Sequence, residues 1–253
     1  MNINLQIIEK IIFSKKDEKV FKNINFDKEK IKNINYDFDN IVVNKPWGFE
    51  YRVYSSKDVS VWILKIKKDK KTSLHCHTNK KTSLILLDGE ANIFTLNKKI
   101  HLKCGNAVTI DKGVFHRTSS DYGKDILVME IETPTNKNDI VRFEDEYKRS
   151  NSGYESKESF SEVKDLDIFL NYNNIKNNSG ILGDCEIKII NNFSEKIKLL
   201  NEKTLICPIK LESKNNKNKI KLGEIYEKNF IKERDTLSID LEEFLVIQKK
   251  QSK

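Results

Sequence analysis

Short apolar runs separated by turn residues fill residues 41–149, and this pattern constrains the fold more than any other feature. The runs are rich in β-branched residues and read VSVWILKIKK, TSLILLDGEANIFTL, NAVTI and DILVMEIE. Asp88-Gly89 and Lys112-Gly113 fit tight connections between antiparallel strands. Many short strands at this spacing favour a sandwich or barrel, so we expect an all-β fold with an antiparallel barrel centred on residues 42–149.

Composition divides the chain into four regions. Residues 1–40 are rich in Lys, Asn and Ile and contain neither Gly nor Pro, which is consistent with an N-terminal arm of short strands or of helix. The barrel pattern occupies residues 41–150. SNSG at 150–153 and NNSG at 177–180 mark the two ends of residues 151–180 and predict a linker there, and residues 181–253 return to strand-like runs.

The C-terminal region is loosely similar to the barrel region. LKCGNAVTIDKGVFHRTSSDYGKDILVMEI and IKLGEIYEKNFIKERDTLSIDLEEFLVIQ both run from an apolar strand through Gly to a strand, a charged loop and a closing apolar strand. Two interpretations stay open: a second, degenerate copy of the barrel made by duplication, or the general similarity of β meanders. Residues 181–253 contain no histidine, so any metal chemistry is expected in the first half.

Charge and cysteine content exclude several classes of protein. The net charge is +8, but Lys and Asn are spread over the whole chain without an Arg-rich block, so we expect no nucleic-acid partner. The four cysteines show no CxxC spacing and predict no disulfide framework. No run approaches the ~20 apolar residues of a membrane helix, and the N-terminus lacks a signal-peptide cleavage site. We therefore expect a reduced cytoplasmic protein without a membrane partner.

Three of the four histidines follow a pattern typical of a metal site. His75 and His77 lie at alternate positions of an expected strand, so their side chains point to the same face. In a barrel, one such face converges on the interior. Gly89 lies twelve positions after His77, at the end of the next expected strand. A second segment, GNAVTIDKGVFH, ends at the third histidine, His116. Three imidazoles converging inside a barrel would make a metal site.

This stretch resembles the cupin superfamily, a family of jelly-roll barrels with two short motifs. The first motif contains Gly, an HxH pair, Glu and Gly, and corresponds to DKKTSLHCHTNKKTSLILLDG; the second corresponds to GNAVTIDKGVFHRTSS. Four positions depart from the motifs: Asp69 and Asp111 replace a Gly and a Pro, Ser120 replaces an Asn, and Thr82 replaces the Glu. Asp suits turn positions, whereas Thr82 removes the one anionic ligand.

A closer resemblance exists to the mannose-6-phosphate isomerase domain of the type II, guanylyltransferase-linked family. Four ordered blocks carry it: KPWGFEYRV (45–53), SLHCHTNKKTSLILLDGEA (73–91), IDKGVFHR (110–117) and NDIVRFEDEYKR (138–149). The resemblance implies a cupin barrel, with the C-terminal region as a possible second, degenerate cupin-like domain.

The resemblance also implies a divalent metal cofactor, with Zn, Mn, Fe, Co and Ni as candidates. The ligands of the family correspond to His75, His77, Thr82 and His116, which leaves three histidines and no carboxylate. The alternative interpretation makes the three histidines packed, hydrogen-bonded barrel residues. His101 lies on the strand IHLKC and is expected to be an ordinary surface histidine.

Three further residues are candidates for catalysis. Glu130 and Glu132 share one face of the last barrel strand, so both are either solvated or directed into the cavity, where one would transfer a proton. Arg142 in the closing block suits bidentate phosphate binding, although a surface salt bridge is equally ordinary. Arg117 and Arg149 are weaker candidates for the same role.

The function expected from the resemblance is that of a sugar-phosphate isomerase or epimerase in carbohydrate or surface polysaccharide metabolism. Its small-molecule partner would be a sugar phosphate or a nucleotide sugar, and a homodimer is expected by analogy. Two alternatives remain. Three neutral imidazoles suit Fe(II), as in a dioxygenase-type cupin. The loss of the Glu at Thr82 also suits a non-catalytic cupin that binds a sugar phosphate.

Overall fold

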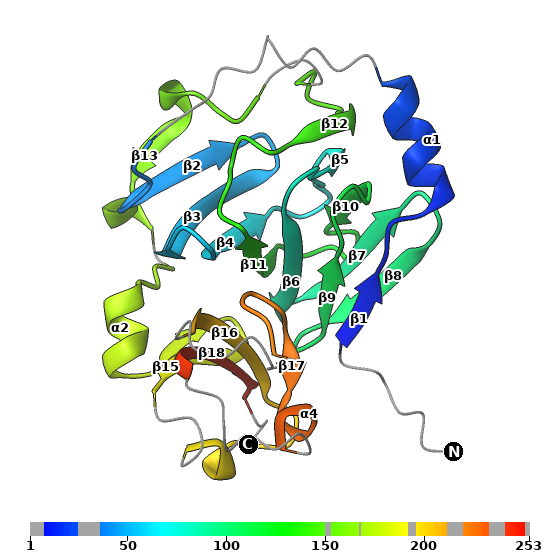
Figure 1. Ribbon diagram of the computed structural model, residues 1–253. Helices are drawn as coiled ribbons and strands as arrows, with labels where there is room; N and C mark the ends of the chain where they lie inside the picture. Colours follow the sequence, from blue (N-terminus) through cyan, green and yellow to red (C-terminus); the bar gives the residue numbers. More distant parts are fainter. Residues whose placement is uncertain are drawn as a thin grey trace.

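The computed structural model describes residues 8–24, 36–149, 153–166, 168–191, 196–211, 220–232 and 241–250 (Figure 1). Strands in these ranges form three sheets, and the all-β fold expected from the sequence is confirmed. Of the helices in the same ranges, none has the length and apolar character required to span a bilayer.

The largest sheet has eight strands and forms one wall of the barrel. Neighbouring strands are antiparallel except β1 and β9, which pair in parallel at one edge. The order across the sheet is β1 (Ile8–Ile11), β9 (Ala107–Ile110), β6 (Lys81–Asp88), β11 (Ile126–Thr133), β4 (Ser60–Ile66), β3 (Gly48–Ser55), β2 (Ile41–Lys45) and β13 (Phe160–Glu162).

A five-stranded sheet forms the opposite wall and carries two of the three candidate metal ligands, His75 and His116. Its order is β12 (Val141–Glu144), β5 (Leu74–Cys76), β10 (His116–Ser119), β7 (Glu90–Thr95) and β8 (Lys99–Lys103). Side chains from both walls fill the interior, among them Trp62 and Leu64 of β4, Leu84 of β6 and Ile93 of β7. The interior face of a strand is therefore set by simple alternation.

The central strands of the eight-stranded sheet are buried on both faces. On β4, Trp62 and Leu64 face the barrel interior, whereas Val61 and Ile63 belong to a second core on the outer face. This second core explains why VSVWILKIKK and DILVMEIE read as almost continuous apolar runs instead of alternating ones.

The C-terminal region supplies the layer that covers this outer face. Its described residues form one five-stranded antiparallel sheet, which lies beneath the barrel in Figure 1. The order is β14 (Gly180–Leu182), β15 (Cys185–Ile190), β18 (Leu241–Lys249), β16 (Leu205–Leu211) and β17 (Tyr226–Glu227). Ile187 and Leu205 pack in one hydrophobic core with Ile63 of the barrel. The contact is close, since a Cβ added at Gly223 would lie 1.8 Å from Thr133 Oγ1.

The remaining elements are short helices. They are α1 (Lys15–Asn23), α2 (Tyr172–Asn177), α4 (Lys228–Lys232) and the single turns η2 (Lys157–Ser159), η3 (Val163–Asp165) and η4 (Ile197–Leu199). Helix α1 begins with a capping box between Ser14 and Asp17 and packs its Val20 against the outside of β5 and β12. The described part of the N-terminal arm thus contains both a strand and a helix, and residues 1–7 and 25–35 lie outside the described ranges.

Candidate metal centre and adjoining cavity

Three histidines converge on one point inside the barrel. His75 and His116 are cross-strand partners on β5 and β10, and His77 follows directly after β5. One ring nitrogen of each lies within 4.8 Å of the others, close to the spacing that one ion with bonds of ~2.1 Å can bridge. Cys76 points away from them into the core beneath α1, as strand alternation predicts.

Hydrogen bonds orient all three rings in the same way. Nδ1 of His75 donates to the carbonyl oxygen of Ser73 (2.8 Å), and Nδ1 of His116 donates to that of Val114 (3.0 Å). Nδ1 of His77 likewise donates to the carbonyl oxygen of Asp139. A carbonyl oxygen can only accept, so each ring carries its proton on Nδ1 and keeps the lone pair on Nε2.

The electrostatic environment keeps these rings neutral. Burial lowers the pKa of His75 and His77 well below the ordinary value, and burial lowers that of His116 to about 4. Nε2 of His77 is buried without a hydrogen-bond partner. A buried acceptor without a partner is costly, whereas a metal ion would satisfy it. Three neutral imidazoles with free Nε2 atoms therefore fit a divalent ion such as zinc, cobalt, nickel or iron.

Thr82 stands at the position where the cupin motif has its glutamate. It lies on β6 with its side chain on the interior face, where it is 1% exposed, and its hydroxyl oxygen has no hydrogen-bond partner. Its cross-strand partner on β11 is Glu132. Three histidines and no acidic residue form the cluster of potential ligands found within the described residues.

A cavity that is partly open to solvent adjoins the histidines. Carboxylates and cations line it together with Trp47, the tryptophan of the KPWG block. The charged lining residues are Lys45, Glu50, Lys80, Glu130, Glu132, Lys137, Arg142, Arg149 and Glu155.

Glu130 and Glu132 both face the cavity, and their environments differ. Burial raises the pKa of Glu130, with the charge of Lys137 opposing and that of Glu132 reinforcing this shift. For Glu132, the nearby charges of Lys137 and Lys80 outweigh burial and lower its pKa to about 2. Two neighbouring carboxylates with pKa values pushed apart are a common arrangement for proton transfer, with separate roles for the two groups.

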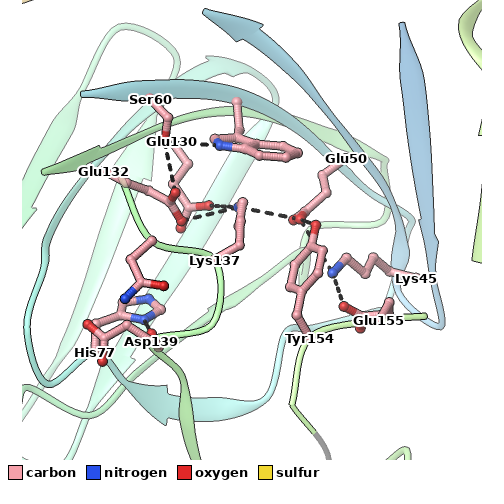
Figure 2. Close-up of polar contacts among 12 residues, drawn as sticks. Lys45, Glu50, Ser60, His77, Glu130, Glu132, Lys137, Asp139, Tyr154 and Glu155 are labelled. Carbon is pink, nitrogen blue, oxygen red and sulfur yellow. Dashed lines mark hydrogen bonds and ion pairs between the residues drawn. The ribbon is translucent and has the colours of Figure 1, made fainter. Parts of the chain in front are cut away.

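Lys137 links these two carboxylates to Glu50 on β3 of the same sheet (Figure 2). Its ammonium lies 3.2 Å from Glu132, 3.3 Å from Glu130 and 3.4 Å from Glu50. It also lies 3.9 Å from the centre of the Trp62 ring, a cation–π contact. Tyr154 donates a hydrogen bond to Glu50 on the same side.

The arginines differ from one another in position. Arg142 lines the cavity, donates to the carbonyl oxygen of Gly153 at 2.8 Å and lies 3.9 Å from Glu155. Arg149 also reaches the lining and pairs with Asp145 and Glu155. Arg117 pairs with Glu144 instead and is not among the lining residues.

His101 is separate from the site. It lies on the edge strand β8, exposed, with its Nε2 2.7 Å from Glu90. This position matches the ordinary surface role expected from the sequence.

Several cavity residues carry no signal in the sequence. Lys80 and Lys137 lie among many lysines that face solvent, so their types do not distinguish them. Tyr154 and Glu155 fall in the segment 151–180 interpreted as a linker, yet residues 153–166 pass along the barrel and add strand β13 to its larger sheet. Lys80 and Asp139, whose carbonyl oxygen orients His77, do lie within two of the quoted blocks, SLHCHTNKKTSLILLDGEA and NDIVRFEDEYKR.

Comparison with known proteins supports a sugar-related cupin. Residues 34–145 match the family described as mannose-6-phosphate isomerase C-terminal. No match was found among curated proteins.

Three solved structures illustrate the similarity of fold. The capsular polysaccharide assembling protein CapF from Staphylococcus aureus is 17% identical, with a TM-score of 0.37 over 41% of this chain and 34% of its own. A cupin-2 domain protein from Shewanella frigidimarina is 22% identical, with a TM-score of 0.31 over 36% of this chain and 83% of its own. KdgF from Halomonas sp. is 14% identical, with a TM-score of 0.33 over 44% of this chain and 94% of its own. The alignment thus spans about a third of CapF. The match to the mannose-6-phosphate isomerase C-terminal family over residues 34–145 covers the barrel and less than half of the 253 residues of this chain.

Proposed function

We propose that this chain is a metal-dependent isomerase or epimerase that acts on a phosphorylated or nucleotide-linked sugar. The observation that carries the proposal is the placement of three histidines, each with Nε2 free, on the wall of a cavity that also holds Glu130 and Glu132. The match of residues 34–145 to a mannose-6-phosphate isomerase domain supports a sugar as the substrate.

His75, His77 and His116 would hold a divalent metal ion. When bound, the ion supplies Lewis acidity, which polarises the substrate oxygens and stabilises the charge that develops on them. The protein contributes the orientation of the three rings, since each Nδ1–H is held by a backbone carbonyl.

Glu130 is the proposed proton-transfer group. In an aldose–ketose isomerisation, a base removes a proton from the carbon beside the carbonyl and returns it to the former carbonyl carbon. The raised pKa of Glu130, caused mainly by burial, brings its proton affinity closer to what such a base requires. Glu132 is less suited to this step, because its lowered pKa keeps it ionised.

Arg142 is the proposed contact for the anionic group of the substrate. It reaches the cavity lining but already contacts Gly153 and Glu155. A phosphate would therefore bind in competition with Glu155, and its affinity is expected to depend on salt concentration.

Two other functional classes predict different results for the same protein. An iron-dependent dioxygenase would consume oxygen, and a non-catalytic binding protein would bind the sugar phosphate without turnover. Three neutral imidazoles without a carboxylate suit Fe(II) as well as zinc, cobalt and nickel, and this ligand set is the observation behind the dioxygenase alternative.

Exchange of substrate hydrogen with deuterated water tests the proposal. Full-length protein loaded with zinc, cobalt or iron is incubated with a panel of hexose phosphates and nucleotide sugars, and NMR follows deuterium at the carbons beside the carbonyl. We expect metal-dependent exchange that Glu130→Gln abolishes. Oxygen uptake without exchange, or binding without either, would replace the proposal by one of its alternatives.

A further inference from the structure

The cavity contains a carboxylate that the metal centre, as described so far, does not use. Glu132 is the cross-strand partner of Thr82, the position where the cupin motif has its acidic ligand. Directly paired residues of an antiparallel sheet present their side chains on the same face with Cβ atoms about 5 Å apart. The two side chains are therefore neighbours on the interior wall of the barrel.

We propose that Glu132 supplies the negative charge of the three-histidine metal centre in place of the carboxylate missing at Thr82, and that Lys80 competes with the metal for it. The inference rests on the metal site proposed above and adds to it one charge donor and one competitor. In this arrangement the acidic residue lies on β11, directly opposite the motif position on β6.

Burial and contacts favour Glu132 for this role. Its side chain is 1% exposed, and its carboxylate accepts hydrogen bonds from Lys80 (2.6 Å) and from the Ser60 hydroxyl (2.9 Å). A buried carboxylate without cations nearby would be protonated, whereas Glu132 is held in its charged form. The barrel thus keeps a permanent negative charge next to the empty ligand position.

Lys80 connects this carboxylate to the histidines. Its backbone N–H donates to the carboxylate of Asp139 at 2.9 Å, and the carbonyl oxygen of the same Asp139 accepts a hydrogen bond from Nδ1 of His77. Lys80 also lines the same cavity as His75, His77 and His116.

A divalent ion at the histidines and the ammonium of Lys80 repel each other and attract the same carboxylate. Removal of the Lys80 charge should therefore strengthen metal binding, and the gain should be larger while Glu132 is present.

Glu130 provides a matched control on the same strand and face. Its cross-strand partners are Trp62 and Leu84, so it faces the interior without neighbouring the Thr82 position. It contacts Lys137 at 3.3 Å and has no hydrogen bond to Lys80 among the described contacts. Neutralising Glu130 should therefore reduce metal affinity much less than neutralising Glu132.

The test is a set of equilibrium zinc and cobalt titrations of full-length protein after metal removal, by competition with a chromogenic chelator. Glu132→Gln should weaken binding at least tenfold, Glu130→Gln less than threefold, and Lys80→Met should strengthen it several-fold. Because Glu132→Gln leaves a buried lysine unpaired and risks misfolding, Lys80→Met/Glu132→Gln is compared with Lys80→Met. The double variant should bind at least tenfold more weakly than the single one.

Two outcomes would overturn the inference at different levels. Wild-type protein that binds neither ion would remove the metal centre, and with it both the proposed function and the role of Glu132. Wild-type protein that binds metal, together with equal affinities for Lys80→Met and Lys80→Met/Glu132→Gln, would remove the role of Glu132 alone. Changes in the visible spectrum of bound cobalt between these two variants would show independently whether the carboxylate reaches the ion.

Discussion

Thr82 and Glu132 face each other across strands β6 and β11, and Lys80 holds the carboxylate of Glu132 at 2.6 Å. A cupin barrel that lacks an acidic residue at its ligand position therefore keeps one on the neighbouring strand. The charge of the site therefore depends on Glu132 and Lys80 as well as on the residue at position 82.

Restoring the motif residue is the first test of this arrangement. Thr82→Glu places a carboxylate at the family position, so we expect divalent metal affinity to rise by about tenfold or more, the scale on which changes around the ligands act. Chelator competition measures the affinity. Unchanged or weaker binding by a normally folded variant would show that the family ligand set does not transfer to this chain.

The choice of histidines is tested by a matched pair of substitutions. His77→Ala removes one of three convergent nitrogens and should reduce bound metal sharply, whereas His101→Ala lies on the exposed strand β8 and should leave it unchanged. Elemental analysis of the purified variants gives the answer. Equal losses from both would mean that the wrong histidines were chosen.

Glu130 should control turnover and its dependence on pH. Glu130→Gln is expected to lower kcat by ~10²-fold or more, the usual contribution of a general base, while metal content stays near that of the wild type. Since a base must be ionised and burial raises the pKa of Glu130, kcat should rise with pH through a midpoint above 4.5. A pH–rate profile without such a limb would assign the proton transfer to another group.

Glu155 should contribute to stability in a pH-dependent manner. The charges of Lys45, Arg142 and Arg149 outweigh burial and lower the pKa of Glu155 to about 2, below its ordinary value of 4.5. The stabilisation is therefore complete above pH 4.5 and is lost as the pH falls toward 2. Glu155→Gln should cost about 3 kcal/mol near neutral pH and less in acid, as urea unfolding at a series of pH values would show. A difference that does not change with pH would contradict the assignment.

The shared core predicts that the C-terminal sheet and the barrel unfold together. Ile187 on β15 is fully buried in the core that also contains Ile63 of the barrel. Ile187→Ala should destabilise the protein by about 2–5 kcal/mol and lower the single unfolding midpoint of both parts. Ile181 on β14 is 63% exposed, and its substitution by Ala should cost less than about 0.5 kcal/mol. Two separate transitions, with only one shifted, would instead show independent units.

Three expectations from the sequence stay predictions. They are the homodimer, the cytoplasmic location and the division of the chain at residues 40, 150 and 180. Sedimentation of the full-length protein would test the first, and limited proteolysis at the proposed boundaries the last.

The fold and the three histidines were accessible from the sequence because both depend on local rules. Alternation along a strand places His75 and His77 on one face and Cys76 on the other, whatever the rest of the chain does. The same alternation places Glu130 and Glu132 together, but it leaves open whether their shared face is wet or buried. That choice depends on which segments cover the strand.

The sequence by itself thus determined the barrel, the histidine cluster and the carboxylate missing at Thr82. Only the tertiary structure decided that Glu132 lies opposite Thr82, that Lys80 and Lys137 enclose it, and that Tyr154 and Glu155 close the cavity. These contacts join segments far apart in the chain, and strand register and loop packing, rather than local pattern, bring them together. The lysines in particular resemble all the solvated lysines of this chain until the fold buries them beside carboxylates.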